Sequence, residues 1–583
     1  MSVPTAELTA PSTPARGPAR SARLTELLAG GRLYIWLGAA ALAIGALSLL
    51  IPSTPSYDPW AWLVWGREIV HLKLHTTGGP TWKPLPVLFT TVFALFGKAA
   101  PDLWLVVARA GAVMAVVMVF KVATRFMREL TGGLGASPWR RALWPVLLAG
   151  VIAAGSLISS RGFISDNALG YSEGLMTALV LLAIDRHLAG ARRQAFVVGF
   201  FAALDRPELW LAWGPYGLYL FWKDAGARRL VIGLFLLIPV LWFLPEYWGS
   251  GHFFRGVSRA QQPRSNSPAF AQCPFCTELA KHAWPTVLLR VKAAAIIAGL
   301  VALAGLWRAR RSWWPAGSRR PVGLQTPEDR GRAGLLLAGI GGAAWWVLIA
   351  VLTQAGFSGN DRYLVLGAAL VAIAGGVGWG WAAASVDGML RRLGSGRLLG
   401  STPPGSGLAS GIGKSSGLAS GIGTGSGLAS GTGTGSRLAS GIGALVVIAV
   451  LIAVPPWIGS TIVDIPATHR ALVYQAHLRE DMARAVAELG GPSRVRRCGT
   501  VMTEGFQVPM LAWTLGVHTD EVQASPLNPR VLPPAPNVVF QTRAQRHAHL
   551  LPFVRAWTGV NYQLVAHVRS FRVYANCAGK VTL

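Results

Sequence analysis

The sequence predicts a mainly α, polytopic helical membrane protein with about eleven transmembrane helices and a small α+β extracytoplasmic domain at the C-terminal end. Three observations lead to this class. Of the 583 residues, 52% are hydrophobic and only 14% are charged, and the mean hydropathy is +0.43. Apolar segments of membrane-spanning length recur along the chain, and arginine clusters separate them. This composition excludes an ordinary water-soluble globular protein.

The net charge of +29 would suggest nucleic-acid binding in a soluble protein. Here the basic residues fall in short clusters between apolar segments, as expected for cytoplasmic loops that obey the positive-inside rule. We therefore expect membrane lipids as surroundings and no nucleic acid as a partner.

The N-terminal residues 1–32 are rich in Pro, Ala, Thr and Arg, which predicts a disordered cytoplasmic tail. The first apolar segment, about 33–51, is long enough to span a bilayer. The following Ser53-Thr54-Pro55-Ser56 lacks a small-x-small cleavage pattern, so the segment is expected to remain as an anchor.

A multipass domain is predicted over 33–385. Further spanning segments are expected at about 103–122, 143–160, 171–187, 229–246, 286–306, 334–353, 363–384 and 444–459. The stretch 195–222 forms either one long kinked helix or two short helices broken at Asp205-Arg206-Pro207-Glu208. Two crossings keep the dense arginine cluster at 308–332 in the cytoplasm, so we prefer them. The N-terminus is then cytoplasmic and the C-terminus is extracytoplasmic.

Two large outside loops follow from this topology, at 52–102 and 247–285. In the first loop, Pro84 to Phe96 is too short to span and is expected at the outer interface. Four tryptophans, Trp60, Trp62, Trp65 and Trp82, are expected in the interfacial aromatic belt.

The four cysteines all fall on the predicted outside, the oxidising compartment. Cys273-Pro274-Phe275-Cys276 has the spacing of a redox motif or half of a zinc site, but neither structural frame surrounds it. A small structural disulfide is the preferred interpretation.

Residues 386–443 repeat Leu-Ala-Ser-Gly with a period of ten, which suggests a solenoid or a flexible linker. Because each copy offers so little to bury, we expect a cytoplasmic Gly/Ser-rich linker before the last span at 444–459. The extracytoplasmic domain is expected over 460–583. It should contain a helix at 467–489, strands at 537–540 and 571–574, and a disulfide between Cys498 and Cys577.

The first outside loop begins with the sequence Tyr57-Asp58-Pro59-Trp60, in which Asp58 is the leading candidate for a catalytic residue. Asp before Pro is also a favoured helix start, so Asp58 is alternatively a helix cap. Transfer of a group to a hydroxyl needs a carboxylate that accepts the proton, and Asp58 can serve. Nearby Arg67 and Glu68 are candidate substrate-binding residues, although Glu68 can simply pair with Arg67.

Other charged groups on the predicted outside are further candidates for substrate binding. Asp166, in Ser165-Asp166-Asn167 near Tyr171 and Glu173, either caps a helix or contacts substrate. Arg206 and Glu208 either pair with each other or contact a sugar or a lipid phosphate. Arginine suits phosphate because its guanidinium makes paired hydrogen bonds. For this reason Arg255, Asp361 and Arg362 join the list, and Lys73, Lys83, Arg259 and Arg264 add positive charge on the same side.

These residues together resemble the multipass GT-C class of glycosyltransferases. The resemblance rests on Asp58 in the first outside loop, Pro84-Leu85-Pro86, Ala108-Arg109-Ala110, the break at Arg206-Pro207-Glu208, and Asp361-Arg362-Tyr363. It covers most of 33–385 as architecture. The class implies a polyprenyl-phosphate sugar as donor and a first-loop acid as base or metal ligand. No second acid adjoins Asp58, so a divalent metal at Asp58 is left open, and no metal-binding residues are assigned.

The resulting hypothesis is a plasma-membrane enzyme that transfers a sugar from a lipid-linked sugar donor to an envelope glycan or protein acceptor on the outer face. The arginine-rich composition is similar to that of actinobacterial envelope proteins. Two alternatives remain: a transporter or flippase of lipid-linked glycans, which predicts inverted repeats and mid-membrane charges, and a non-catalytic envelope assembly protein.

Overall fold

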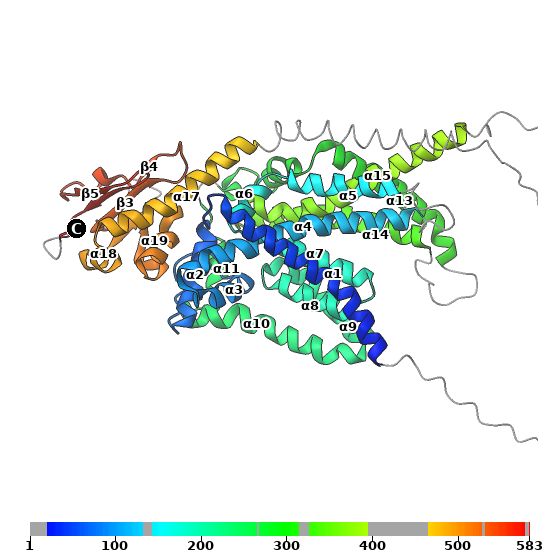
Figure 1. The fold of residues 1–583 in the computed structure, drawn as a ribbon, viewed down its shortest axis with the longest axis horizontal. Helices are drawn as coiled ribbons and strands as arrows, with labels where there is room; N and C mark the ends of the chain where they lie inside the picture. Colours follow the sequence, from blue (N-terminus) through cyan, green and yellow to red (C-terminus); the bar gives the residue numbers. More distant parts are fainter. Residues whose placement is uncertain are drawn as a thin grey trace, which may run out of the picture.

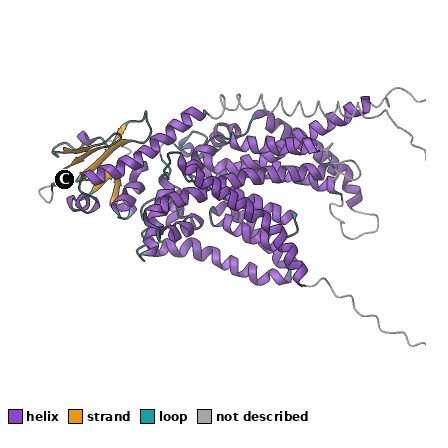
Figure 2. Cartoon of the chain, viewed as in Figure 1, coloured by secondary structure: helices purple, strands orange, loops and turns teal. Residues whose placement is uncertain are grey.

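The computed structural model describes residues 20–131, 143–264, 267–313, 326–394, 464–526, 531–577 and 582–583. Most of this chain is helical, and the strands lie together at one end of the molecule (Figure 2). Three predicted segments lie outside the described residues: the first 19 residues of the N-terminal tail, most of the repeat linker, and the span expected at 444–459.

Every spanning segment predicted within the described residues is helical. The helices are α1 (Arg20–Leu47), α4 (Ala100–Leu130), α5 (Leu143–Ile158), α7 (Glu173–Leu188), α8 (Arg192–Ala203), α9 (Trp210–Lys223), α10 (Arg228–Ser250), α13 (Leu289–Trp313), α14 (Pro327–Gln354) and α15 (Val365–Gly394). Six described helices are long and apolar enough to cross a membrane. Helix α1 begins at Arg20, well before the expected residue 33, and α15 continues to Gly394, beyond the expected 385.

The helix core depends on small residues that let backbones approach closely. Gly376 and Gly380 of α15 face α5. An added Cβ would come within 2.4 Å of the Ala149 carbonyl oxygen at the first position and 2.6 Å of the Pro145 carbonyl oxygen at the second. This is the small-xxx-small spacing that favours tight helix pairs in membranes. It explains why α5 and α15 can pack so closely.

The stretch 195–222 forms two short helices, α8 and α9, as predicted. Between them Arg206 is extended (φ −145°, ψ 125°) and Pro207–Leu209 form one 3₁₀ turn. The proline ends α8 because it cannot continue the backbone ladder. The break therefore holds Arg206 and Glu208 at the end of the helical bundle, where the candidate site lies.

The first loop contains two helices, α2 (Tyr57–Val70) and α3 (Pro84–Ala94). The expected aromatic belt is wrong here, because all four tryptophans are almost fully buried, with exposures of 0–3%. Their rings pack inside the protein: Trp62 meets Trp104 at 5.5 Å between ring centroids, and Trp65 meets Trp82 at the same distance. Helix α2 is thus part of a core rather than a layer at a lipid surface.

Within its described residues, the C-terminal domain combines three α-helices with a mixed sheet, as the α+β prediction states. The helices are α17 (Ile465–Glu488), α18 (Pro492–Cys498) and α19 (Val508–Leu515). The strands are β1 (Val501–Thr503), β2 (Val522–Ala524), β3 (Val538–Arg543), β4 (Leu550–Leu551), β5 (Gln563–His567) and β6 (Arg572–Ala575). The sheet order is β2-β1-β3-β6-β5, and β4 pairs with β3. Strands β2, β1 and β3 are parallel, whereas β6 is antiparallel to β3 and β5.

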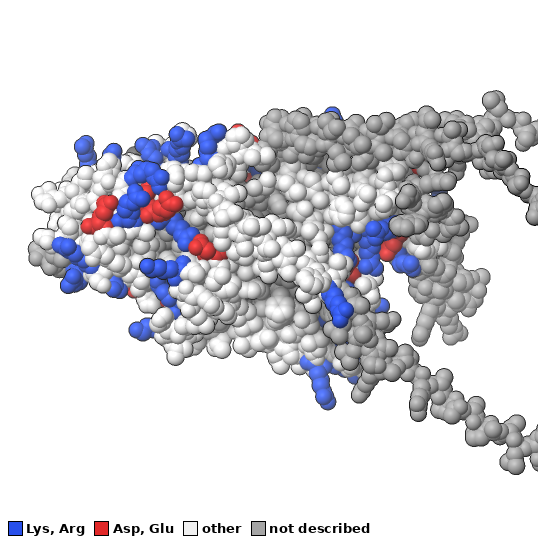
Figure 3. Space-filling view, viewed as in Figure 1, with Lys and Arg blue, Asp and Glu red and all other residues white. Residues whose placement is uncertain are grey.

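Both predicted disulfides are present, Cys498–Cys577 in this domain and Cys273–Cys276 in the second large loop. Helix α19 packs on α2, and one hydrophobic cluster includes Trp60 of α2 together with Leu511 of α19. Figure 1 shows the domain at the end of the molecule that carries α2, whereas α1 starts at the opposite end. Lys and Arg gather toward both ends of the visible face and leave a nearly uncharged zone between them (Figure 3). This distribution matches a multipass membrane protein.

Candidate functional site

Charged side chains from five separate segments converge at the end of the helical bundle that bears α2. Each of these side chains lies at a helix start or in a turn, and the turns at one end of a helical bundle are close together in space. They are Asp58 in the first turn of α2, Lys83 just before α3, Glu173 at the start of α7, Arg206 between α8 and α9, and Arg362 in the 3₁₀ turn η8 (Asp361–Leu364). We call these five residues the charge cluster.

Arg362 bridges the two acids of the charge cluster. Its Nη2 donates to Asp58 Oδ2 at 2.6 Å, and its Nε lies 3.5 Å from Glu173 Oε1. The same Glu173 oxygen accepts from Lys83 Nζ at 3.2 Å and from Arg206 Nη1 at 3.4 Å. Three cations therefore surround one carboxylate oxygen, which makes Glu173 the centre that holds them together.

Aromatic faces complete the positioning of both arginines. The Arg206 guanidinium lies 3.6 Å from the Tyr363 ring centroid, and that of Arg362 lies 3.9 Å from the Tyr171 ring centroid. Stacking of this kind suits the flat guanidinium group and would not suit a lysine. Tyr171 is itself held by a 2.9 Å hydrogen bond between its hydroxyl and Ser56 Oγ.

Burial divides the charge cluster into an inner and an accessible part. The Glu173, Arg206 and Lys83 side chains are only 2%, 5% and 9% exposed. Asp58 and Arg362 are 13% and 12% exposed. A molecule that enters from solvent therefore meets an acid and a guanidinium first, with further positive charge behind them.

The alternative roles weighed for Asp58 and Arg206 have clear outcomes. The N-cap of α2 is Ser56, which makes no side-chain capping bond, and Asp58 bonds to Arg362 instead of capping. Arg206 does pair with Glu208, at 3.4 Å between Nη2 and Oε1, but it also contacts Glu173. Glu208 is 15% exposed and lies at the margin of the charge cluster.

Asp166 and Asp361 adjoin the charge cluster. Asp166, in the short helix α6 (Phe163–Ala168), makes no side-chain hydrogen bond to the described residues. Burial raises its pKa to about 7; Arg362 lowers it, whereas Glu173 and Asp361 raise it further. Asp361 is hydrogen-bonded to His282 and lies 3.7 Å from Arg161. Both predicted acids are thus beside Arg362.

Three of the predicted substrate-binding residues, Arg67, Glu68 and Arg255, make their contacts elsewhere. No hydrogen bond or ion pair within the described chain joins them to the charge cluster. Arg67 donates to the backbone carbonyls of Trp513 and Val517, at 3.1 and 2.6 Å. Glu68 accepts from His518 Nδ1 at 2.8 Å and does not pair with Arg67. Both residues fasten α2 to the C-terminal domain.

Arg255 is the third of these residues. It lies in α11 (Arg255–Ala260) of the second large loop, and its Nη1 is 3.7 Å from Glu246. It also donates to backbone carbonyls of residues 77–80, including Pro80 at 2.6 Å. Burial lowers the pKa of the Arg255 guanidinium, against the opposing effect of Glu246. Arg255 therefore ties the two large loops together.

Lys83 and Glu173 belong to the charge cluster, although the sequence indicates them only as neighbouring charges and not as site residues. Each has a local sequence feature that is compatible with a buried charge: Lys83 stands between Trp82 and Pro84, and Glu173 begins a helix after Tyr171-Ser172. Neither feature predicts that the two side chains are in contact, because they are 90 positions apart in the sequence. Within the described residues no group of three or more His, Cys, Asp or Glu side chains is arranged to hold a metal ion.

No known protein family and no curated protein matches the chain. Among solved structures, the chain is similar to ArnT from Cupriavidus metallidurans. A crystal structure of ArnT bound to undecaprenyl phosphate matches with 12% identity and a TM-score of 0.44, over 94% of this chain and 99% of that one. The apo crystal structure matches with 14% identity and a TM-score of 0.43, over 95% and 100%.

Proposed function

We propose that this protein is a membrane glycosyltransferase of the GT-C type. It transfers a sugar from a polyprenyl-phosphate donor to a glycan or protein acceptor of the cell envelope, on the outer face of the plasma membrane. The proposal rests on the side chains of this chain and not on the likeness to ArnT. The observation that carries it is the charge cluster, in which a partly exposed carboxylate and guanidinium lie 2.6 Å apart and two more deeply buried cations lie beside Glu173.

In the proposed reaction Asp58 is the catalytic base. Its carboxylate takes the proton from an acceptor hydroxyl while that oxygen attacks the anomeric carbon of the donor. The bond between the anomeric carbon and the phosphate oxygen breaks, and the lipid phosphate leaves with the bonding electrons. Because the new bond forms opposite the leaving group, the transfer inverts the anomeric configuration.

The three cations stabilise the departing lipid phosphate. Arg362 is the most accessible, so its fork is expected to bind phosphate oxygens directly, while Arg206 and Lys83 add positive charge from beneath. Phosphate bound to Arg362 competes with Asp58 for the same guanidinium. Donor binding would therefore release the Asp58 carboxylate to act as base only when a donor is present.

The test is a transfer assay with purified protein in lipid nanodiscs and a radiolabelled polyprenyl-phosphate sugar. We expect release of free polyprenyl phosphate together with transfer of the sugar to an added envelope acceptor fraction. Movement of intact donor across a vesicle membrane without release of lipid phosphate would instead support the flippase hypothesis. Absence of both would leave the assembly-protein alternative and overturn the enzyme proposal.

A further inference from the structure

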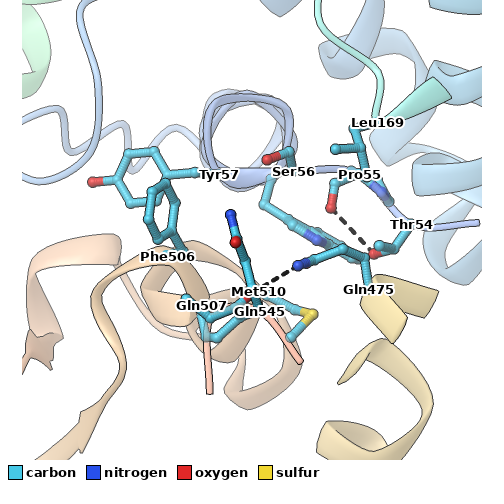
Figure 4. A pocket seen from close by; sticks show the side chains of 12 residues that line it. Thr54, Pro55, Ser56, Tyr57, Leu169, Gln475, Phe506, Gln507, Met510 and Gln545 are labelled. Atoms are coloured by element: carbon cyan, nitrogen blue, oxygen red, sulfur yellow. Dashed lines mark hydrogen bonds between the residues drawn. The ribbon is translucent and has the colours of Figure 1, made fainter. Parts of the chain in front are cut away.

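A pocket lies between the first loop and the C-terminal domain, immediately beside the start of α2 (Figure 4). It opens to solvent, and its cavity volume is about 140 Å³. This volume is below the roughly 300–1,000 Å³ typical of sites that enclose a whole small molecule, so the pocket can hold only part of a longer ligand. The first loop and its neighbourhood contribute Thr54, Pro55, Ser56, Tyr57, Trp60 and Leu169. The C-terminal domain contributes Gln475, Phe506, Gln507, Met510, Ala544 and Gln545.

The lining mixes polar and apolar side chains and carries no acidic or basic one. Three glutamines offer both amide donors and carbonyl acceptors, and three aromatic residues, Tyr57, Trp60 and Phe506, offer flat apolar faces. This pairing of amides with aromatic faces suits a neutral sugar, whose hydroxyls form hydrogen bonds and whose C–H groups pack on rings. It does not suit a phosphate or a carboxylate, for which cations would be needed.

Two polar groups of the lining have no hydrogen-bond partner in the described chain, and the Trp60 indole N–H is the one that is fully buried. Gln507 is only 5% exposed, and its side-chain amide makes no hydrogen bond to the described residues. The Trp60 indole N–H is likewise buried without an acceptor. A polar group that is left without a hydrogen-bond partner destabilises the protein when it is buried. A ligand that bonds to these groups would offset that destabilisation. Gln475 donates to the Ala544 carbonyl at 2.8 Å, which leaves its own side-chain oxygen able to accept.

The pocket adjoins the charge cluster through a short polar connection. Ser56 lines the pocket, and its hydroxyl is bonded to the hydroxyl of Tyr171, the ring on which Arg362 stacks. Tyr57, another lining residue, directly precedes Asp58 in the chain. A molecule bound in the pocket therefore lies next to the proposed catalytic base.

We infer that this pocket is the acceptor subsite and that the acceptor is an uncharged glycan, held by Gln475, Gln507 and Gln545 against the aromatic faces. The inference rests on the proposed function and narrows its acceptor from glycan or protein to a neutral glycan. It also gives the C-terminal domain a role, since half of the pocket belongs to that domain. Two arginines lie against rings of this wall but outside the lining: Arg264 is 3.5 Å from the Phe506 ring centroid, and Arg479 is 5.7 Å from the Trp60 ring centroid.

The test measures binding without donor and without turnover, using the full-length protein in nanodiscs and equilibrium dialysis. The probes are mannotriose and arabinotriose as neutral trisaccharides, and trigalacturonic acid as an anionic one of similar size. We expect saturable binding of at least one neutral probe. Gln507→Leu should weaken it about tenfold, as loss of hydrogen bonds worth about 1.4 kcal/mol would.

The matched control is Gln523→Leu, because Gln523 is a partly buried glutamine of the same domain that also has an unpaired side-chain oxygen but does not line the pocket. It should bind like the unaltered protein. Equal binding by the two variants, a preference for the anionic probe, or binding of neither neutral probe would overturn the inference. Neutral binding without any release of lipid phosphate would keep the glycan site while refuting the transferase.

Discussion

Helix α7 carries a buried carboxylate near each end. Both carboxylates pair with cations, but the two sets of cations come from different kinds of structural element. Glu173 at the start is 2% exposed and Asp185 in the last turn is 1% exposed. Asp185 accepts from Lys121 Nζ at 2.7 Å, lies 3.4 Å from Arg125 Nη1 and is hydrogen-bonded to Tyr34. All these partners lie on helices, and Lys121 and Arg125 are one turn apart on α4. The Asp185 end is therefore a clamp between packed helices.

The Glu173 end takes its cations from a loop before α3, the break between α8 and α9, and the turn before α15. It also includes a second acid, Asp58, from a fourth segment. Groups borne on turns face the space between segments, whereas groups on neighbouring helix turns mainly satisfy one another. The Glu173 end thus has the character of a functional site, because its partners come from several turns. They also leave a carboxylate, Asp58, and a guanidinium, Arg362, together and partly exposed.

The largest expected difference between the two ends is in catalysis. Asp58→Asn should reduce sugar transfer about 10³-fold, because the amide cannot accept the acceptor proton. Asp185→Asn should leave turnover per folded molecule within about twofold, since Asp185 lies at the clamp. Radiolabel transfer, normalised to monodisperse protein, measures both. Full activity in Asp58→Asn would remove Asp58 from the mechanism.

A conservative change of the bridging arginine should have the next largest effect. Arg362→Lys keeps the charge but cannot reach Asp58 and Glu173 at once or stack on Tyr171, so we expect about a hundredfold loss of transfer. Arg125→Lys at the clamp is the matched control and should retain activity. Steady-state kinetics at varied donor concentration would show the loss. Equal kinetics for the two lysine variants would contradict a special role of this end.

The two buried acids should be more alike in stability than in catalysis. Glu173→Gln and Asp185→Asn each leave buried cations undercompensated, and each should lower the free energy of unfolding by about 2 kcal/mol. The exposed pair Arg193–Asp224 provides the control, because Asp224→Asn at such a solvent-screened site should shift the unfolding midpoint much less than either buried change. Thermal unfolding in one detergent would compare the three variants. A neutral Glu173→Gln would mean that Glu173 does not hold the charge cluster together.

Much of this arrangement could be predicted from local sequence. The break at Pro207 follows from proline chemistry, and the placement of Asp58, Arg206 and Arg362 at one end follows from span lengths and the arginine bias. The helix of the C-terminal domain and its strands β3 and β6 also follow from hydrophobic patterns.

The docking of the C-terminal domain could not be predicted in this way. Arg67 meets Trp513 across 446 positions, and Glu68 meets His518 across 450. Periodicity reports which face of an element is buried but not which distant element covers it. For the same reason the tryptophans of α2 resembled an aromatic belt, although they pack in a protein core.

The smallest expected effect concerns Asp166. Its pH dependence shows whether this carboxylate lies beside the charge cluster or belongs to it. Its pKa is raised from 3.8 to about 7, chiefly by burial. In the unfolded chain the group loses its proton near pH 4, whereas the folded protein retains it until about pH 7. Its contribution to stability is therefore complete below pH 3.8 and is lost as the pH rises through about 7. Asn cannot ionise, so Asp166→Asn should gain stability relative to the unaltered protein across this window and gain no more above it.

Thermal unfolding between pH 4 and pH 8 should show the difference in midpoint growing by about 1–2 °C. A difference that stays constant with pH would mean that Asp166 is already ionised beside Arg362 and belongs to the charge cluster itself.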